Sequence, residues 1–258
     1  MKKAIIIISL VLMTVSMQLN AQNSKEKQKD TQQKPSQEQV DAWKKAEDIR
    51  LHNDWANLER FREDNAKVGL PAAGVNRIVF MGNSITEGWA NLNPEFFAGK
   101  PYVDRGISGQ TTPQMLVRFR QDVINLKPKV VVILAGINDI AGNTGPMTLE
   151  MTENNLAGMT EMAQANGIKV VLCSVLPAYD FPWRPGLQPA EKVVTLNGWI
   201  KKYAAEKGCV YVDYFSPMVD ERKGLKSAYT NDGVHPTKAG YEIMDPLVEK
   251  GIKEALAK

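Results

Sequence analysis

Apolar residues along this chain follow two alternating patterns, and each pattern predicts a different kind of element. Short, continuous apolar runs are typical of strands that are buried on both faces of a sheet. Five such runs cover residues 77–81, 102–104, 130–135, 169–175 and 210–212. Between them, apolar residues recur at three- and four-residue spacing, which predicts amphipathic helices. These helices cover residues 115–126, 156–163 and 193–203, and a last one runs from about residue 238 to the end.

The order of strand then helix repeats along the chain, which implies right-handed crossovers and a parallel sheet covered on both faces. We therefore predict an α/β fold with three α/β/α layers, a flavodoxin-like five-stranded parallel sheet and an N-terminal helical extension. In such sheets the active site forms where loops leave the carboxyl ends of the strands. The residues of interest are therefore those that directly follow each apolar run.

The chain begins with a segment that resembles a bacterial signal peptide. Residues 1–21 place Lys2 and Lys3 before an apolar run, and small Ala21 precedes a polar stretch. The alternative is a single membrane anchor, but the run is short for crossing a bilayer. We expect export to the periplasm or the extracellular space, and no membrane contact in the mature form.

Two further segments precede the first strand. Residues 22–37 are rich in Gln, Lys and Ser, which predicts a flexible linker. Residues 38–258 form the predicted domain, and residues 38–70 are expected to be a helical segment that packs on it. Three of its apolar residues recur on one helical face, with Asp54 placed to cap that turn. These residues are Trp55, Leu58 and Phe61.

Charge and cysteine content exclude some classes of protein. Without Lys2 and Lys3, 30 of the 32 basic residues remain against 29 acidic ones. This balance gives no reason to expect a nucleic-acid partner, because phosphate binding needs a basic surplus. Cys173 and Cys209 both lie in apolar runs or at their edge. We expect two separate buried thiols rather than a disulfide.

Only two histidines occur, so any chemistry that needs an imidazole is confined to them. His52 lies in the N-terminal helical region and is expected to be a surface or interhelix residue. His235 lies in a loop before the last helix, three residues after Asp232. A carboxylate there can accept the Nδ1 proton and leave Nε2 free as a base. The alternative is an aspartate that caps a turn beside a histidine that only packs.

A candidate nucleophile, Ser84, follows the first apolar run. It stands where a strand ends and a helix begins, so free backbone N–H groups and the helix dipole favour a developing negative charge there. The alternative is that Ser84 is a helix N-cap, with Glu87 completing a capping box. The elbow motif of the α/β-hydrolase fold, G-x-S-x-G, is absent around it.

Two other loops offer hydrogen-bond donors at the same edge of the predicted sheet. Gly106 follows the second apolar run, and a glycine lets the backbone approach a substrate closely. Asn138 follows the third, and its side-chain amide can point at an oxyanion. Each residue is also common in ordinary turns. Convergence of the four sites on one edge is what favours a functional interpretation.

No metal or cofactor is predicted. The chain contains no H-E-x-x-H motif, no clustered Cys and His, and no calcium-loop pattern of aspartates. The fragment Gly106 to Gly109 is only a G-x-x-G, which on its own is a weak indication of nucleotide binding.

Taken together, these residues resemble the SGNH hydrolases, also called the GDSL esterase/lipase family. The family's four blocks have counterparts in the correct order, and the resemblance extends from about Asp54 to the C-terminus. The blocks are Gly82-Asn83-Ser84, Gly106, Gly136-Ile137-Asn138-Asp139 and Asp232-Gly233-Val234-His235-Pro236. The chain looks most similar to bacterial relatives of the platelet-activating-factor acetylhydrolase catalytic subunit, several of which are carbohydrate acetylesterases.

The resemblance implies a role for each of these residues. Ser84 is then the nucleophile, His235 its base and Asp232 the group that orients the histidine. The oxyanion hole consists of the N–H groups of Ser84 and Gly106 and the side-chain amide of Asn138. One departure is Asn83, where the family usually has aspartate; asparagine keeps one acceptor.

The substrate is less clearly indicated. Trp183 and Arg184 lie in an aromatic, proline-rich loop after the fourth apolar run, and with Ile137 they are candidate substrate contacts. The alternative is that this loop is ordered and only covers the core. We predict a secreted serine esterase that hydrolyses short-chain esters, acetyl esters above all, on carbohydrate. One alternative is a lipid esterase, lysophospholipase or thioesterase on the same fold. A second is a glycan-binding protein that keeps the fold without turnover.

Overall fold

The computed structural model describes residues 36–258. The chain divides into two compact units, Met1–His52 and Asn53–Lys258. Residues 37–52 of the first unit belong to helix α2 (Gln37–Asn53), in which no residue is buried. The predicted signal peptide and nearly all of the predicted linker lie outside the described residues. The packing of residues 38–52 on the domain stays a prediction.

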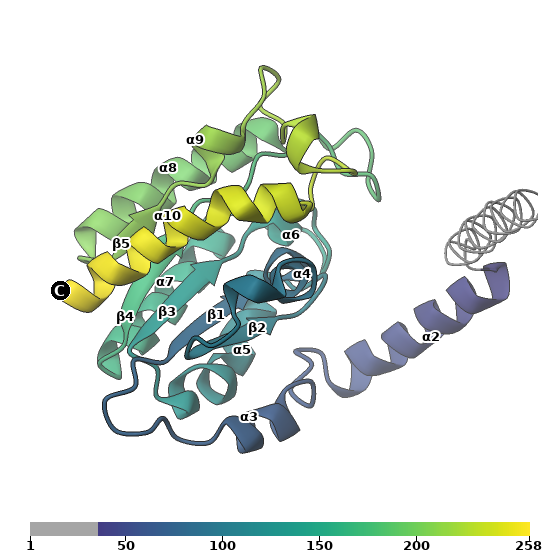
Figure 1. The fold of residues 1–258 in the computed structure, drawn as a ribbon. Coiled ribbons are helices and arrows are strands. Elements are labelled where there is room, and N and C mark those ends of the chain that lie inside the picture. The colour runs from purple at the N-terminus through teal and green to yellow at the C-terminus, as the bar shows by residue number, and fades with distance from the viewer. Residues whose placement is uncertain (1–35) are drawn as a thin grey trace, which may run out of the picture. The chain divides into compact units, whose positions relative to one another are not determined.

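The second unit contains a five-stranded sheet in which all strands are parallel. Its strands are β1 (Ile78–Gly82), β2 (Tyr102–Gly106), β3 (Val130–Leu134), β4 (Lys169–Cys173) and β5 (Val210–Val212). Their order across the sheet is β2-β1-β3-β4-β5, with Val79 beside Val131 at its centre (Figure 1). All residues of β1 and β3 are buried, as expected of strands covered on both faces. The predicted flavodoxin-like fold is confirmed.

Helices cover both faces of this sheet (Figure 1). Helices α4 and α10 contact each other on one face, whereas α5 contacts α7 and α7 contacts α8 on the other. Their bounds are α4 (Ser84–Leu92), α5 (Thr112–Asp122), α7 (Leu149–Ala165), α8 (Ala190–Glu206) and α10 (Lys238–Ala257). Short elements complete the unit: η1 (Pro94–Phe96), η2 (Ile124–Leu126), α6 (Ile137–Ile140), α9 (Phe215–Met218) and η3 (Ser227–Tyr229).

Residues 54–61 are not helical, and this corrects the predicted continuous helical segment. The carboxylate of Asp54 accepts hydrogen bonds from the backbone N–H groups of Leu58, at 2.8 Å, and Glu59, at 3.0 Å. These bonds close turns, and a short helix α3 (Arg62–Val68) begins only after them. The three apolar side chains therefore do not share a helical face. Phe61 is buried, whereas Trp55 and Leu58 are exposed.

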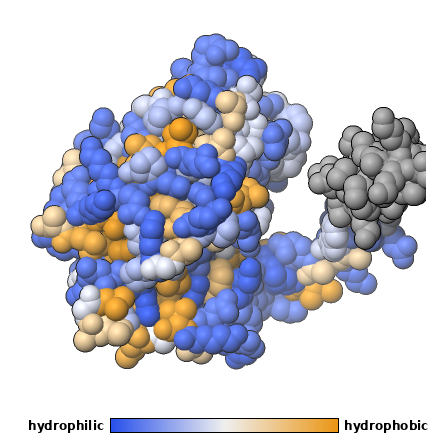
Figure 2. Space-filling model, in the orientation of Figure 1, coloured by the Kyte–Doolittle hydropathy of each residue, from blue (hydrophilic) through white to orange (hydrophobic). Residues whose placement is uncertain are grey.

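The core lies between the sheet and the helices on either side of it. Cys173 and Cys209 are both buried and unpaired, which confirms two separate thiols. The face shown in Figure 2 is mostly hydrophilic, with apolar residues in small separate patches. Within residues 36–258 no helix combines the length and the apolar character needed to cross a membrane.

Candidate active site

Ser84 is the first residue of α4 and directly follows the end of β1. Asn83 is the N-cap, and its side-chain oxygen accepts a hydrogen bond from the Ile85 N–H at 3.0 Å. The acceptor that asparagine shares with the family's usual aspartate is therefore in use. Glu87 accepts from the Ser108 N–H at 3.0 Å rather than closing a capping box. The alternative role of Ser84 as N-cap is therefore wrong, and its hydroxyl is free for another partner.

That partner is His235, which lies 151 residues further along the chain. Ser84 Oγ is 2.9 Å from His235 Nε2, and His235 Nδ1 is 2.6 Å from Asp232 Oδ2. The other carboxylate oxygen of Asp232 accepts from the backbone N–H groups of His235, at 2.8 Å, and Val234, at 2.9 Å. The structure thus aligns a hydroxyl, an imidazole and a carboxylate in the order that proton transfer requires.

The Asp232 carboxylate is held in its ionised form. Burial acts to raise the pKa of Asp232, but hydrogen bonds from His235 and Val234 outweigh it and bring the pKa below its usual value. An ionised carboxylate accepts the Nδ1 proton of His235 and so directs the Nε2 lone pair toward Ser84.

Asn138 lies in α6, directly after β3, and its side chain is buried. Its Nδ2 atom donates one hydrogen to the backbone oxygen of Gln110 at 2.9 Å. An amide nitrogen carries two hydrogens, so the second remains available to a ligand. The neighbouring Ile137 side chain is buried in the core. Ile137 therefore offers almost no accessible surface to a substrate, which corrects its place among the substrate contacts.

Asp139 fixes the position of α6 against the loop after β2. Its carboxylate is buried and accepts hydrogen bonds from the backbone N–H of Thr112, at 3.0 Å, and from the Thr112 hydroxyl. Burial raises the pKa of Asp139 to about 6, although the bonds from Thr112 act to lower it. Sequence reasoning included Asp139 in a motif but gave it no role, because its partner is 27 residues away.

Gly106 is not brought into this group, in contrast to its predicted place in the oxyanion hole. Its N–H donates to Asp104 Oδ1 at 2.7 Å. The N–H of Ile107 bonds to Gly82 of β1, and because bonding directions alternate along a strand, the Gly106 N–H points to the open edge of the sheet. Gly106 is needed for packing instead: a Cβ there would lie 2.1 Å from the Glu87 nitrogen in α4.

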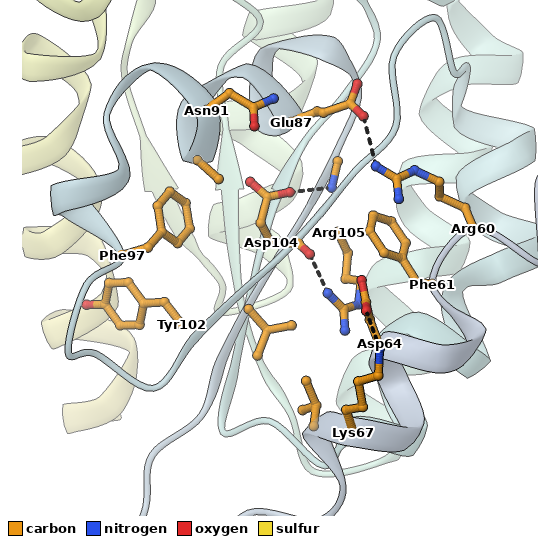
Figure 3. A pocket seen from close by; sticks show the side chains of 14 residues that line it. Arg60, Phe61, Asp64, Lys67, Glu87, Asn91, Phe97, Tyr102, Asp104 and Arg105 are labelled. Carbon is orange, nitrogen blue, oxygen red and sulfur yellow. Dashed lines mark hydrogen bonds and ion pairs between the residues drawn. The ribbon is translucent and has the colours of Figure 1, made fainter.

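The open edge of β2 lines a cavity of about 470 Å³ (Figure 3). Arg105 donates from Nη1 to the Asp104 carbonyl at 2.6 Å, so side chains of the strand satisfy two of its outward backbone groups, this carbonyl and the Gly106 N–H. Arg60 pairs with Glu87 at the end of the cavity nearest α4. Such self-satisfied edges are a common protection against unwanted strand pairing. Ser84 and His235 do not line this cavity, so we assign it to the sheet edge and not to catalysis.

Gly109, three residues beyond Gly106, has a backbone N–H that sequence reasoning did not single out as a donor. It has a left-handed φ of 76°, and among residues 36–258 its N–H has no hydrogen-bond acceptor. The next residue, Gln110, holds the Asn138 amide through its carbonyl. The indication in the sequence was the second glycine of the G-x-x-G fragment, since glycine adopts positive φ without strain.

Trp183, one of the predicted substrate contacts, lies beside the histidine. Its ring is 6.1 Å from the His235 ring and is stacked on Phe181 at 5.0 Å. The indole N–H donates to the Asn143 side chain at 3.2 Å, and the ring remains 40% exposed. Arg184 uses one guanidinium nitrogen to bind the Ala141 carbonyl at 2.9 Å. Trp183 therefore presents a surface at the site, whereas Arg184 fastens the loop that carries it.

A parallel α/β/α sheet with a Ser-His-Asp arrangement at its carboxyl edge defines a class, the triad-containing hydrolases of this three-layer architecture. Residues 80–243 match the GDSL-like lipase/acylhydrolase family, and the chain belongs to this family. It is a carboxylic ester hydrolase.

Three relatives illustrate the similarity. A crystal structure of a GDSL-like lipase from Bacteroides thetaiotaomicron VPI-5482 superposes with a TM-score of 0.77 at 50% identity, covering 78% of this chain and 100% of that one. Esterase TesA of Pseudomonas aeruginosa is 30% identical over 62% of this chain and 75% of its own. An acetylxylan esterase of Xylanibacter ruminicola is 24% identical over 72% of this chain and 45% of that protein.

Proposed function

We propose that this chain is an exported serine esterase that removes short acyl groups, acetyl above all, from carbohydrate esters. The observation that carries the proposal is the hydrogen-bonded series from Ser84 Oγ through His235 to Asp232. Export is supported by the signal-peptide pattern of residues 1–21. Carbohydrate is supported by the name of the acetylxylan esterase relative and by the exposed Trp183 ring beside His235.

The geometry fits a two-step mechanism with an acyl-enzyme. His235 Nε2 takes the Ser84 proton as Oγ forms a bond to the ester carbonyl carbon. The carbonyl electron pair moves to oxygen, then returns as the bond to the alcohol breaks and His235 protonates the leaving oxygen. In the second step water gives its proton to His235, attacks the acyl carbon and releases the carboxylic acid, and Ser84 recovers its proton.

Three donors are proposed to stabilise the oxyanion. The Ser84 N–H lies in the first turn of α4, where the helix dipole favours negative charge. The second hydrogen of the Asn138 amide is the next donor. For the third we replace Gly106 with Gly109, because the Gly106 N–H is held by Asp104 and points to the sheet edge. Fixed donors of this kind lower the barrier without reorganisation during the reaction.

Release of acetate from acetylated polysaccharides tests the proposal. We expect the purified protein to release acetate from acetylated xylan or a comparable neutral glycan, and Ser84→Ala to release none above background. Both proteins should unfold at the same temperature, because the serine side chain is small and half-buried. An active Ser84→Ala variant would end the proposal.

The competing function is a lipid esterase or thioesterase, which the family description as lipase keeps open. Values of kcat/KM for p-nitrophenyl acetate and p-nitrophenyl decanoate distinguish the two functions. We expect the acetyl ester to be the better substrate. A preference for the decanoyl ester, with no acetate released from glycans, would favour the lipid esterase.

A further inference from the structure

The direction in which the leaving alcohol extends follows from the triad. His235 Nε2 must reach the leaving oxygen to protonate it, so the alcohol half of the ester lies on the His235 side of Ser84. The oxyanion donors lie on the other side, in the loops after β2 and β3. Under the proposed function that alcohol is a sugar, and the units joined to it extend past His235 and Trp183.

A cavity of about 300 Å³ adjoins the triad loop, the segment at residues 230–236 that carries Asp232 and His235. Asp232 and Gly233 form one wall, so the cavity shares a loop with the triad itself. The loop that carries Trp183 forms a second wall, and Arg222 lies on a third. We call this cavity the Tyr179 cleft, because the Tyr179 ring is its largest exposed aromatic surface, with 45% of the residue accessible.

The walls of the Tyr179 cleft are held in place before any ligand arrives. Asp180 accepts hydrogen bonds from the N–H groups of Phe181, at 2.9 Å, and Gly186, at 2.7 Å, and so closes the aromatic loop. Asp220 accepts a hydrogen bond from the N–H of Gly224 at 2.7 Å and so closes the turn that carries Arg222. A preformed pocket loses less entropy when it binds a ligand.

The chemistry of the lining suits a neutral sugar. The Arg222 guanidinium lies over one face of the Tyr179 ring, 4.9 Å from its centroid. The part of the ring that stays exposed is an apolar surface for the C–H face of a pyranose, and the guanidinium N–H groups can donate to hydroxyl oxygens. Asp180 and Asp232 both line the cleft, against the single arginine. This excess of carboxylates disfavours an anionic ligand such as a uronic acid or a phosphate headgroup.

We propose that the Tyr179 cleft is a subsite for a second sugar unit of the leaving alcohol, so that the preferred substrate is an acetylated oligosaccharide. Trp183 connects the two places: its ring stacks on Phe181, which lines the cleft, and its centroid is 6.1 Å from that of the His235 ring. This inference rests on the proposed function and adds the part of the substrate that determines affinity.

Values of kcat/KM for acetylated sugars of one to four units, with p-nitrophenyl acetate as a substrate that cannot reach the cleft, test the subsite. We expect kcat/KM to rise between one unit and two or three. Tyr179→Ala should lower kcat/KM for the oligosaccharides about tenfold, mainly through KM, because stacking holds ground state and transition state alike. Activity on p-nitrophenyl acetate should stay within about twofold.

Arg222→Ala has a matched control in Arg62→Ala. Both guanidinium groups are exposed and each pairs with a nearby carboxylate, Asp220 or Glu59, but Arg62 lies outside the cleft. We expect only Arg222→Ala to lower the ratio of kcat/KM for acetylated oligosaccharides to kcat/KM for the acetylated single sugar. If the wild type deacetylates glycans but chain length and Tyr179→Ala have no effect, the subsite is wrong and the proposed function stands. If it releases no acetate from any glycan, both are wrong.

Discussion

The two walls of the active site are built in opposite ways. The oxyanion wall is the part proposed to hold the oxyanion, residues 106–112 between β2 and α5 and residues 136–143 around α6. It contains buried polar groups bonded to one another, among them Gln110 and Asn138. The substrate wall, the loop at residues 176–187, presents the aromatic rings of Tyr179 and Trp183 to solvent. Buried hydrogen bonds thus fix the position of the groups proposed for the chemistry, whereas exposed side chains are left for substrate selection.

Arg118 shows how the oxyanion wall is fastened. Its guanidinium is fully buried and pairs with Asp122 at 3.0 Å. It also donates to Gln110 Oε1 at 2.6 Å and to the carbonyls of Gly82, at 3.0 Å, and Arg105, at 2.8 Å. A buried charge is tolerated only with such partners, so the ends of β1 and β2 and the loop that holds Asn138 must keep their relative positions.

Asn138→Ala is expected to give the largest effect on the oxyanion wall. Loss of one oxyanion donor costs roughly 10² to 10³ in kcat. KM should change little, because the donor acts on charge that develops only in the transition state. Steady-state kinetics on p-nitrophenyl acetate measure this. A fall of less than about threefold in kcat would show that Asn138 only packs.

Trp183→Ala probes the substrate wall and should have a smaller effect of a different kind. We expect KM for acetylated glycans to rise about tenfold while kcat stays within about twofold, because an exposed ring contributes binding that is shared by ground state and transition state. Trp55→Ala, at an equally exposed tryptophan, is the control. A fall in kcat as large as that expected for Asn138→Ala would assign Trp183 to the oxyanion wall and remove the contrast between the two walls.

Asp139→Asn tests the burial of the oxyanion wall through the pH dependence of stability. Because the pKa of Asp139 is about 6 in the folded protein and near 4 when unfolded, the folded state binds the extra proton. Wild-type stability from this group is therefore lost as pH rises from about 4 to about 6, by on the order of 2 to 3 kcal/mol.

Thermal unfolding of wild type and Asp139→Asn from pH 4.5 to pH 7.5 measures this loss. We expect the wild type to lose several degrees of Tm relative to the variant over that range, at roughly 2–4 °C per kcal/mol. If the Tm difference between wild type and variant stays constant with pH, or changes in favour of the wild type as pH rises, the Asp139 carboxyl is ionised in the folded protein at little cost.

Asp104→Asn should have the smallest effect on activity. If the Gly106 N–H serves the sheet edge, kcat on p-nitrophenyl acetate stays within about twofold, because asparagine keeps one acceptor for that N–H. Replacing Gly109 by glycolic acid, which exchanges its N–H for an ester oxygen and keeps the φ of 76° accessible, should by contrast cost roughly 10² in kcat. The reverse order of effects would restore Gly106 to the oxyanion hole.

The strands could be predicted from sequence to within about two residues, since strands covered on both faces must be apolar throughout. Residues 77–81 and 210–212, for example, correspond to β1 and β5. The helix predicted across residues 54–61 does not form, because the Asp54 side chain accepts hydrogen bonds from backbone N–H groups that would otherwise bond to helix carbonyls. Helical periodicity reflects only the spacing of apolar residues, so it does not show that a nearby polar side chain takes these hydrogen bonds.

The proposed triad was accessible to sequence reasoning because a strand-end serine and a histidine three residues after an aspartate are local patterns. Gly106 was misplaced because the direction of its N–H depends on strand register, which a motif does not contain. Ile137 was misplaced because it lies next to Asn138 in sequence while its side chain points into the core. The Asp139–Thr112 contact, between separate loops, could not be predicted from spacing at all.

Covalent labelling with a fluorophosphonate probe tests the central claim most directly, since such probes react with a serine activated by a histidine base. Peptide mapping of the labelled wild type should place the adduct on Ser84. Ser84→Ala should take up no label, whereas Ser108→Ala, at an exposed serine in a neighbouring loop, should label like the wild type. An adduct on another residue, or a wild type that releases acetate without being labelled, would contradict the account.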